Sequence, residues 1–344
     1  ATYYQNPESS KLKQPREQHV AEKRWLCWAA LWTNWVSVGS CSAATTTELL
    51  QLDASVFLRC LSGHTLLSVI SNGYAESFRW RLAESKPPLV SVWPDDLYIP
   101  RTDHPNIVLS MSHELQVLVG LCALEVLVRS WSWKVFDFDD ELAALEKELN
   151  NGTCVIVQTD HQSVERVVAV TAVELLRNDG CIFVHLGRWS AGRVVPRCEL
   201  PAVKQNMGEQ ADEAFKRVLA QELSAVAGKA DDLKIVESRV QVDVKDSMRL
   251  RIRTRYIRTV FSAQLKCEKI ETETASNQIF DPCDRRVSGT LGDVIVHTDG
   301  KSTFLSSWMQ RSSFDFVQGP NGDKLLQSYL VGLNVDEEKM SAVG

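Results

Sequence analysis

Apolar residues follow a helical spacing through most of the first half of the chain. Between residues 48 and 149, leucines and valines recur every three or four positions, which is the spacing of one helix face. Residues 115–128 are apolar at nearly every position, so they predict a buried helix. Residues 139–149 begin with acidic residues, which the helix dipole favours, and place leucines along one face. The pattern predicts a helix-rich region that ends near residue 150.

The spacing changes after Gly152, where β-branched runs separated by polar turns replace the helical pattern. A turn at residues 177–180 is typical of a hairpin, and residues 187–201 are rich in Gly, Arg and Pro, which predicts a loop. The pattern predicts three strands, one helix and two more strands, in that order, over residues 155–157, 164–176, 181–186, 211–227, 233–244 and 248–265. This mixture of strands and helices is typical of an α/β domain.

The two ends of the chain differ from its middle. Residues 1–20 are polar and contain two prolines, which is the composition of a disordered tail. The rest is predicted to divide into a helix-rich N-terminal region of residues 21–150, an α/β domain of residues 151–275 and a C-terminal extension of residues 276–344. Residues 322–333 carry apolar side chains at helical spacing, so the extension is expected to end in a helix.

The stretch between Arg24 and Glu48 carries no charged residue, and basic residues precede it. A signal or anchor segment at residues 25–47 is therefore one interpretation. Polar residues interrupt the stretch, however, whereas a membrane span needs about 20 predominantly apolar residues. We favour a helix with an apolar stripe in an intracellular, cytoplasmic protein, because four tryptophans stand at helical spacing, Trp25, Trp28, Trp32 and Trp35.

The net charge of −6 and the pI near 5.7 exclude a protein whose whole surface is basic. Nucleic-acid binding usually needs a broad basic face, so we expect no nucleic-acid partner and only a local phosphate site. The chain of 344 residues, 44% of them hydrophobic, is long enough for two or more domains. Its nine cysteines form no Cys-x-x-Cys pair and no cluster with histidine, and we interpret them as mostly buried, reduced thiols.

A loop and the following helix in the α/β domain carry the clearest chemical pattern. The loop contains Lys204, Gly208 and Glu209, and the helix contains Arg217 and Glu222. Their order and spacing resemble the signature of the Nudix hydrolase family, Gly-x5-Glu-x7-Arg-Glu-U-x-Glu-Glu-x-Gly-U, where U is apolar. In this alignment Glu209 takes the place of the first Glu, Arg217 that of the Arg and Glu222 that of the last Glu. The resemblance covers residues 153–275, about a third of the chain.

The resemblance implies an α/β/α sandwich with a mixed sheet and a divalent metal, Mg²⁺ or Mn²⁺, bound by oxygen ligands. In the family this metal bridges the substrate diphosphate and activates water. By resemblance, Glu222 and Glu209 are the expected metal ligands, and these two glutamates with Arg217 are the expected catalytic residues. Lys204 and Gly208 are the expected ligand-binding residues of the loop.

Several positions of the signature are occupied by other residues. The family's remaining helix glutamates are replaced by Val218 and Gln221, and its two glycines by Val203 and Ser224. Residues 218, 221 and 222 are three and four positions apart, so we expect them on one helix face, where only one carboxylate remains. Metal is therefore expected to bind weakly, with hydrolysis weakened or lost. Acidic residues at 268, 271 and 273 leave a relocated ligand open.

Arginines alternate along the last predicted strand, at Arg249, Arg251, Arg253 and Arg255. A strand places such a series on one face, where the positive charges repel one another unless anions lie opposite. Those anions are either Glu237 and Asp243 on the preceding strand or the phosphates of a ligand. We favour the cross-strand ion pairs and keep Arg251 and Arg253 as candidate phosphate ligands.

Three functions follow from these patterns. The favoured one is a Nudix-like protein that recognises a nucleoside diphosphate-linked small molecule, a pseudoenzyme with weakened or lost pyrophosphate hydrolysis. An active Nudix pyrophosphohydrolase is the first alternative, and a structural subunit that uses the fold as a scaffold is the second. No membrane partner is expected, and a protein partner is expected to bind through the N-terminal region.

Overall fold

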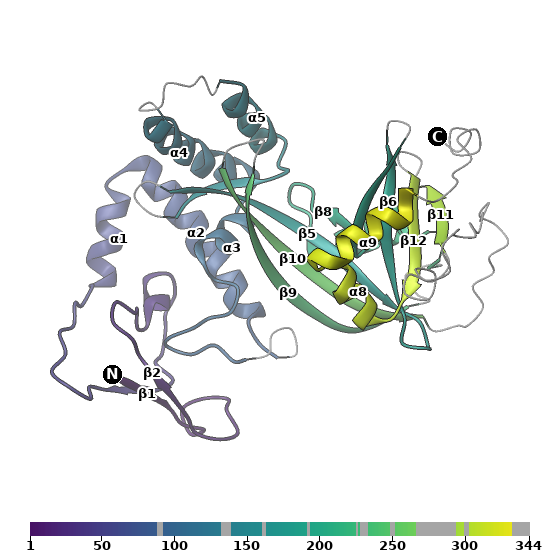
Figure 1. Cartoon of the computed structure of the whole chain (residues 1–344). Helices are drawn as coiled ribbons and strands as arrows, with labels where there is room; N and C mark the ends of the chain where they lie inside the picture. The colour runs from purple at the N-terminus through teal and green to yellow at the C-terminus, as the bar shows by residue number, and fades with distance from the viewer. Residues whose placement is uncertain are drawn as a thin grey trace. The chain divides into compact units, whose positions relative to one another are not determined.

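The computed structural model describes residues 1–87, 92–131, 139–159, 163–190, 193–224, 226–227, 233–247, 252–265, 294–298 and 303–331 (Figure 1). The contacts within the chain divide it into two compact units. The first consists of Ala1–Val168 and Val244–Arg255, and the second of Ala169–Asp243 and Tyr256–Gly344.

The first unit is helix-rich, as the apolar spacing predicts. It contains the start of β5 (Val164–Leu176) and, in chain order, β1 (Thr2–Gln5), β2 (Arg16–His19), the 3-10 helix η1 (Trp28–Leu31), β3 (Ser40–Ser42), α1 (Ala54–Ser62), α2 (Thr65–Glu84), α3 (His104–Leu109), α4 (His113–Trp131), α5 (Asp139–Asn150) and β4 (Val155–Gln158). Helix α4 contains the apolar run at 115–128. Ala123 and Leu124 of that run are buried, but Leu121 and Val128 are 42% exposed, so the helix is buried on one side only.

The first twenty residues contain two strands, which differs from the disordered tail that their composition predicts. Strand β1 pairs antiparallel with both β2 and β3 in a small sheet of order β2-β1-β3. Tyr3 is only 1% exposed, and its hydroxyl donates a hydrogen bond of 2.8 Å to Oδ2 of Asp96. One buried aromatic residue with a distant partner therefore orders a segment that is otherwise polar.

The tryptophan-rich segment does not form the predicted helix. Only η1 is helical there, and Cys27 before it has a left-handed backbone with φ of 54°, a conformation that a continuous helix does not contain. Trp28 and Trp32 pack against α2, where their rings contact Phe78 and Tyr74 at centroid distances of 5.1 and 4.6 Å. Among the residues that the structure describes, no helix combines the length and the apolar composition that a membrane crossing requires.

Asp96 is the polar centre of the N-terminal part of the first unit. Its carboxylate is 3% exposed and accepts hydrogen bonds from the Tyr3 hydroxyl, from Nε1 of Trp35 at 2.6 Å and from the Val38 amide at 3.0 Å. Asp95 beside it accepts from the amides of Leu97 and Tyr98, at 2.8 and 2.7 Å. These two acids, which the sequence shows only as a turn signal, hold together segments far apart in the chain.

The division between the units differs from the boundary expected near residue 150. Strand β4 contacts α3 and α4, and the Nε of Arg166 in β5 donates to Glu148 in α5 at 2.7 Å. These contacts join the helices to the first strands that follow them. The period change near Gly152 thus marks a change of secondary structure within the first unit.

The second unit is built on the larger sheet, whose strand order is β11-β12-β6-β5-β10-β9, with β4 and β8 also on β5 and β7 on β6. In chain order its elements are β5, β6 (Ile182–Ser190), β7 (Arg193–Glu199), β8 (Ala202–Lys204), α6 (Ala211–Gln221), β9 (Leu233–Ser247), β10 (Ile252–Leu265), β11 (Val294–Thr298), β12 (Thr303–Met309), α8 (Arg311–Val317) and α9 (Pro320–Val331). Strands β5, β9 and β10 also give residues to the first unit. The predicted loop at 187–201 is largely strand, because β7 pairs antiparallel with β6.

Alternate residues of the strands supply two separate cores, so helices cover both faces of the sheet. Phe183 and Phe261 pack with α6 on one face, whereas the neighbouring Ile182 and Val260 pack with α8 and α9 on the other. Figure 1 shows α8 and α9 lying across the strands. This arrangement confirms the predicted α/β/α sandwich.

The described cysteines are free, but most are not buried. Cys154 and Cys181 lie in the interior, whereas three are exposed, namely Cys41, Cys60 and Cys122. The expectation of mostly buried thiols was wrong for the described residues, because the exposed ones lie in the first unit on elements that pack on one side only. Cys267 and Cys283 lie outside the described residues.

Candidate functional site

Helix α6 and the loop before it form a locally determined structure. The helix begins with a capping box, in which the Glu213 carboxylate accepts from the Gln210 amide at 3.1 Å. Gly208 in the loop has φ of 71°, a left-handed conformation that glycine adopts without strain. The helix ends at Gln221, earlier than the predicted residue 227, and Glu222 caps it.

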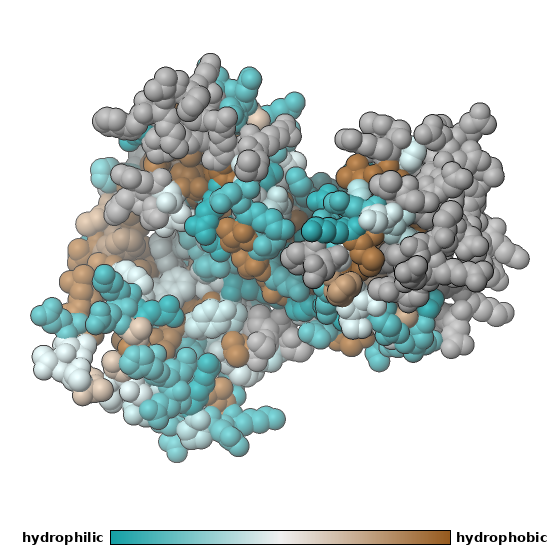
Figure 2. Space-filling view, in the orientation of Figure 1, coloured by the Kyte–Doolittle hydropathy of each residue, from teal (hydrophilic) through white to brown (hydrophobic). Residues whose placement is uncertain are grey.

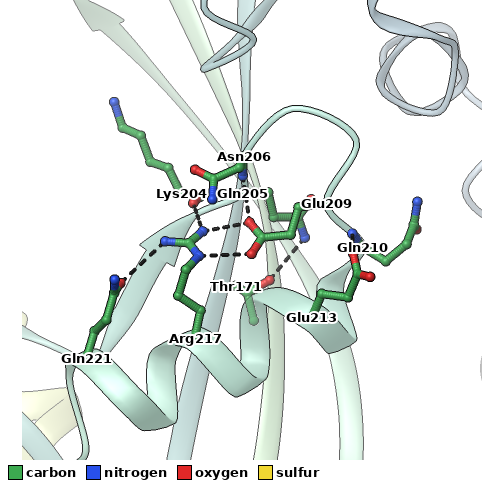
Figure 3. A network of polar contacts seen from close by, with 9 residues as sticks. All are labelled: Thr171, Lys204, Gln205, Asn206, Glu209, Gln210, Glu213, Arg217 and Gln221. Atoms are coloured by element: carbon green, nitrogen blue, oxygen red, sulfur yellow. Dashed lines mark hydrogen bonds and ion pairs between the residues drawn. The ribbon is translucent and has the colours of Figure 1, made fainter.

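Arg217 fastens the loop to the helix (Figure 3). Its Nε and Nη2 donate to the two carboxylate oxygens of Glu209, at 2.9 and 2.6 Å. The same Nη2 donates to the Lys204 carbonyl at 2.6 Å. Glu209 Oε2 also accepts from the Asn206 amide at 2.7 Å. A bidentate pair between Arg and a carboxylate is strong and directional, so both side chains are occupied in holding the loop in place.

The loop is also attached to the sheet. Nε2 of Gln205 donates to the Thr171 hydroxyl of β5 at 3.0 Å, and Figure 3 shows this bond beside the Arg217 contacts. The Lys204 side chain is exposed, and so is Gly208. The loop therefore has a fixed backbone, while Lys204 and Gly208, its two expected ligand-binding residues, face solvent.

Replacing Arg217 with Gln is expected to lower the free energy of unfolding at pH 7 by about 1 to 2 kcal/mol, because a charged, bidentate contact is lost at a site that is partly open to solvent. The hydrogen bonds from Arg217 lower the pKa of Glu209 below its ordinary value. Stability from a lowered carboxyl pKa is present above the unfolded value of about 4.3 and is lost as the pH falls.

Denaturant titrations of wild type and Arg217→Gln from pH 7 to pH 3 measure this effect. The difference in stability should shrink below about pH 4, and Lys216→Gln, an exposed change on the same helix, should show almost no difference. An equal loss at pH 7 and pH 3 would assign the effect of Arg217 to packing of its alkyl chain instead.

Glu222 is held by two histidines from different strands. Nε2 of His185 in β6 donates to Glu222 Oε2 at 3.0 Å, and Nε2 of His297 in β11 donates to the Glu222 carbonyl at 3.1 Å. The other ring nitrogen of His185, Nδ1, lies 2.8 Å from the Ser306 hydroxyl, which is fully buried. Only 5% of the His185 side chain and 12% of the Glu222 side chain are exposed. Glu222 therefore anchors the end of α6 to the sheet.

The residues present do not fit the divalent metal that the Nudix resemblance implies. Val218 is fully buried in the core under α6, Gln221 is exposed with its side-chain oxygen 3.5 Å from Nη1 of Arg217, and Glu222 is directed at His185. The three positions do not share one face as expected, because Val218 and Glu222 are turned toward the sheet and Gln221 toward solvent. Within the described ranges, no group of three His, Cys, Asp or Glu side chains is arranged to hold a metal ion.

The arginine strand is paired internally where it is described. Nε of Arg255 donates to Glu165 Oε2 at 2.7 Å, and Nε of Arg253 lies 3.8 Å from the other oxygen of that carboxylate. The two arginines share a face, as predicted, and the anion beside both of them is Glu165 on β5. Arg249 and Arg251 lie outside the described residues. Arg253 belongs to the first unit and Lys204 to the second.

The residues around Glu222 were missed by sequence reasoning. Phe304 stacks on His185 with ring centroids 4.6 Å apart, and on His297 at 5.5 Å. The available signal was a single histidine inside an otherwise apolar strand, Ile182 to Leu186, together with a serine in β12. A lone histidine in such a strand needs a polar partner once it is buried, and here that partner is the glutamate expected to bind metal.

Comparisons with known proteins found matches among solved structures alone. Neither the protein-family models nor the curated proteins contain a match. Among solved structures, a NUDIX hydrolase from Nitrosomonas europaea is 10% identical with a TM-score of 0.26, over 48% of this chain and 89% of that one. A MutT described for Aliivibrio salmonicida and Vibrio cholerae is 14% identical with a TM-score of 0.22, over 48% of this chain and 98% of that one. Over about half of its length the chain is distantly similar to these two proteins.

Proposed function

We propose that the second unit recognises a nucleoside diphosphate-linked small molecule without hydrolysing it efficiently. One observation carries this proposal: the two glutamates that the Nudix resemblance assigns to metal binding are used to hold the structure together. Glu209 is paired with Arg217 and Glu222 with His185. The loop that the Glu209–Arg217 pair stabilises keeps an exposed lysine and an exposed glycine.

The loop has the properties of a phosphate contact. An ammonium group such as that of Lys204 pairs with phosphate oxygens, and a glycine lets a ligand approach the backbone closely. A side chain built at Gly208 would meet no atom within 4 Å, so the space around it is open. A preformed loop also loses little conformational entropy when it binds.

Thermal unfolding in the presence of nucleoside diphosphates, nucleoside diphosphate sugars and dinucleotides tests the proposal, with Mg²⁺ or Mn²⁺ present or absent. A ligand at a hundred times its Kd should stabilise the protein by about 2.7 kcal/mol. Phosphorus NMR of the same mixtures should show no cleavage of the diphosphate. Metal-dependent cleavage at an ordinary enzymatic rate would instead establish the active pyrophosphohydrolase.

Lys204→Gln locates the binding site, with Lys216→Gln as its matched control. The first change should weaken ligand binding by about 1.5 to 3 kcal/mol, the range for hydrogen bonds to charged groups, and the second should leave it unchanged. Equal effects of the two variants would place the ligand elsewhere.

A structural scaffold is the second candidate, favoured by the burial of the Glu222 contacts. It predicts no stabilisation by any compound in the series and no cleavage. In that case the loop and helix serve only to support the sheet.

A further inference from the structure

Large aliphatic side chains are exposed together along one stretch of the first unit. The stretch includes α1, the segment before it and the first turns of α2. We call these residues the α1 patch; each is between 42% and 97% exposed: Leu49, Leu50, Leu52, Val56, Leu58, Leu66, Leu67 and Val69. Figure 2 shows hydrophobic atoms gathered over the position that α1 has in Figure 1. Exposed apolar surface concentrated in this way marks an interaction site more often than single exposed residues do.

Helix α1 is stabilised by few contacts with the rest of its own unit. It has nine residues and none of them is buried. The side chain of its N-cap residue, Asp53, accepts hydrogen bonds from the amides of Ser55 and Val56 at 2.8 and 3.0 Å. The ring of Phe57 packs edge to face on that of Trp32, with ring centroids 6.2 Å apart. A helix this short is marginal in water without packing on an apolar face. Covering the exposed side of α1 would therefore add stability that the single chain lacks.

The charge of this region selects the kind of partner. Between Asp53 and Glu76 the only charged side chain is Arg59. In a two-fold interface each patch meets an identical patch, so a strongly charged patch would repel its copy. This surface is nearly uncharged and is therefore compatible with a copy of itself. The nearest flanking charges, Glu48 and Asp53, are acidic, which disfavours an anionic membrane surface.

The exposed area matches the apolar part of a stable dimer interface. The exposed fractions in the α1 patch correspond to about four and a half fully exposed aliphatic side chains. At roughly 60 to 120 Å² for each such side chain, this is roughly 300 to 500 Å² of apolar surface per copy. A standard interface buries about 800 Å² per partner, of which somewhat more than half is apolar.

We infer that the α1 patch is a two-fold interface between two copies of this chain. Each copy places its α1 against the same surface of the other, so the exposed leucines are covered reciprocally. This inference concerns the first unit and does not depend on ligand recognition by the second. It gives the protein partner expected at the N-terminal region a definite identity.

Sedimentation of the full chain between roughly 1 and 100 µM tests the inference, since standard interfaces span micromolar affinity and tighter. Wild type should form a dimer that dissociates on dilution. Leu50→Glu combined with Val56→Glu should weaken the dimer by roughly a hundredfold or more, because each charge enters a two-fold interface twice. Phe316→Glu, at a side chain 53% exposed in α8 of the second unit, is the control and should dimerise like wild type.

The single variant Leu50→Glu guards against a folding artefact, because Leu50 is 97% exposed and has almost no packing to lose. It should weaken the dimer while leaving the circular dichroism spectrum and the melting temperature of the dilute protein unchanged. A wild type that remains monomeric at about 100 µM would overturn the inference, since that is weaker than a standard interface. So would a double variant that dimerises as tightly as wild type, or an α1 patch that binds neutral lipid vesicles in a monomeric protein.

Discussion

Val218→Glu should destabilise the second unit by about 3 to 5 kcal/mol, because it would place an unpaired carboxylate in a fully buried position. Val218 is fully buried among the side chains between α6 and the sheet, including Phe183 and Phe261. Burial of this kind raises the pKa of a carboxyl, since it disfavours the charged form. The loss of stability should therefore be largest at neutral pH and should decrease as the pH falls toward 4. Denaturant unfolding at several pH values measures it.

Gln221→Glu is the matched control on the same helix. Gln221 is exposed and its side-chain oxygen lies 3.5 Å from Nη1 of Arg217, so a carboxylate there is solvated and lies near a positive charge. Its effect on stability should stay within about 0.5 kcal/mol. A Val218→Glu variant that folds with wild-type stability and gains Mg²⁺ affinity would show that position 218 faces a metal site after all.

Asp96→Ala should destabilise the first unit by a similar amount, about 3 to 5 kcal/mol. The change removes a buried carboxylate, so the hydrogen-bond donors of Tyr3, Trp35 and Val38 lose their acceptor. The hydroxyl of Tyr3 is buried, and a buried donor left unsatisfied costs about 1 to 3 kcal/mol, while the donors of Trp35 and Val38 are partly buried and add to this cost. Tryptophan fluorescence during urea unfolding should report the loss, since Trp35 is one of the donors.

Asp53→Ala is the control for this second change. Asp53 also accepts two backbone hydrogen bonds, but it is exposed at the start of α1, so its loss should cost only about 1 kcal/mol. Burial and the bond to Asp96 raise the pKa of Tyr3. The contribution of Tyr3 to stability is therefore present below the pKa of about 10 that a tyrosine has in the unfolded chain, and it is lost as the pH rises further. Equal costs for the two aspartates would contradict the central role of Asp96.

Sequence periodicity predicted most of the elements because each of them follows its own local pattern. The hairpin of β5 and β6 is encoded by two β-branched runs and the turn between them, and the amphipathic helix α6 by a stripe of apolar residues. The segments whose structure differs from the prediction depend on partners far away in the sequence. Strand β1 is ordered by Tyr3 reaching Asp96, and β7 exists because β6 offers it an edge. Neither partner is visible in the local sequence.

The local sequence likewise predicted only part of the candidate site. Spacing placed Glu209 and Arg217 correctly at a loop and a helix, and the structure joins them. Spacing could not reveal that Glu222 points at His185, a residue 37 positions away on another strand. Helical positions 218, 221 and 222 were assigned to one face from their separation alone, but Val218 and Glu222 are turned toward the sheet whereas Gln221 is exposed. Glu222, the one acid of the signature that remains on the helix, is held by this histidine.

Titration calorimetry with Mn²⁺ on wild type and Glu222→Gln tests this central claim most directly. The account predicts no tight Mn²⁺ binding that depends on Glu222. It also predicts that Glu222→Gln lowers the free energy of unfolding by about 1 to 3 kcal/mol, because a buried charged contact to His185 is weakened. Micromolar Mn²⁺ binding to wild type that disappears in Glu222→Gln, with stability unchanged, would show that Glu222 is a metal ligand and would contradict the account.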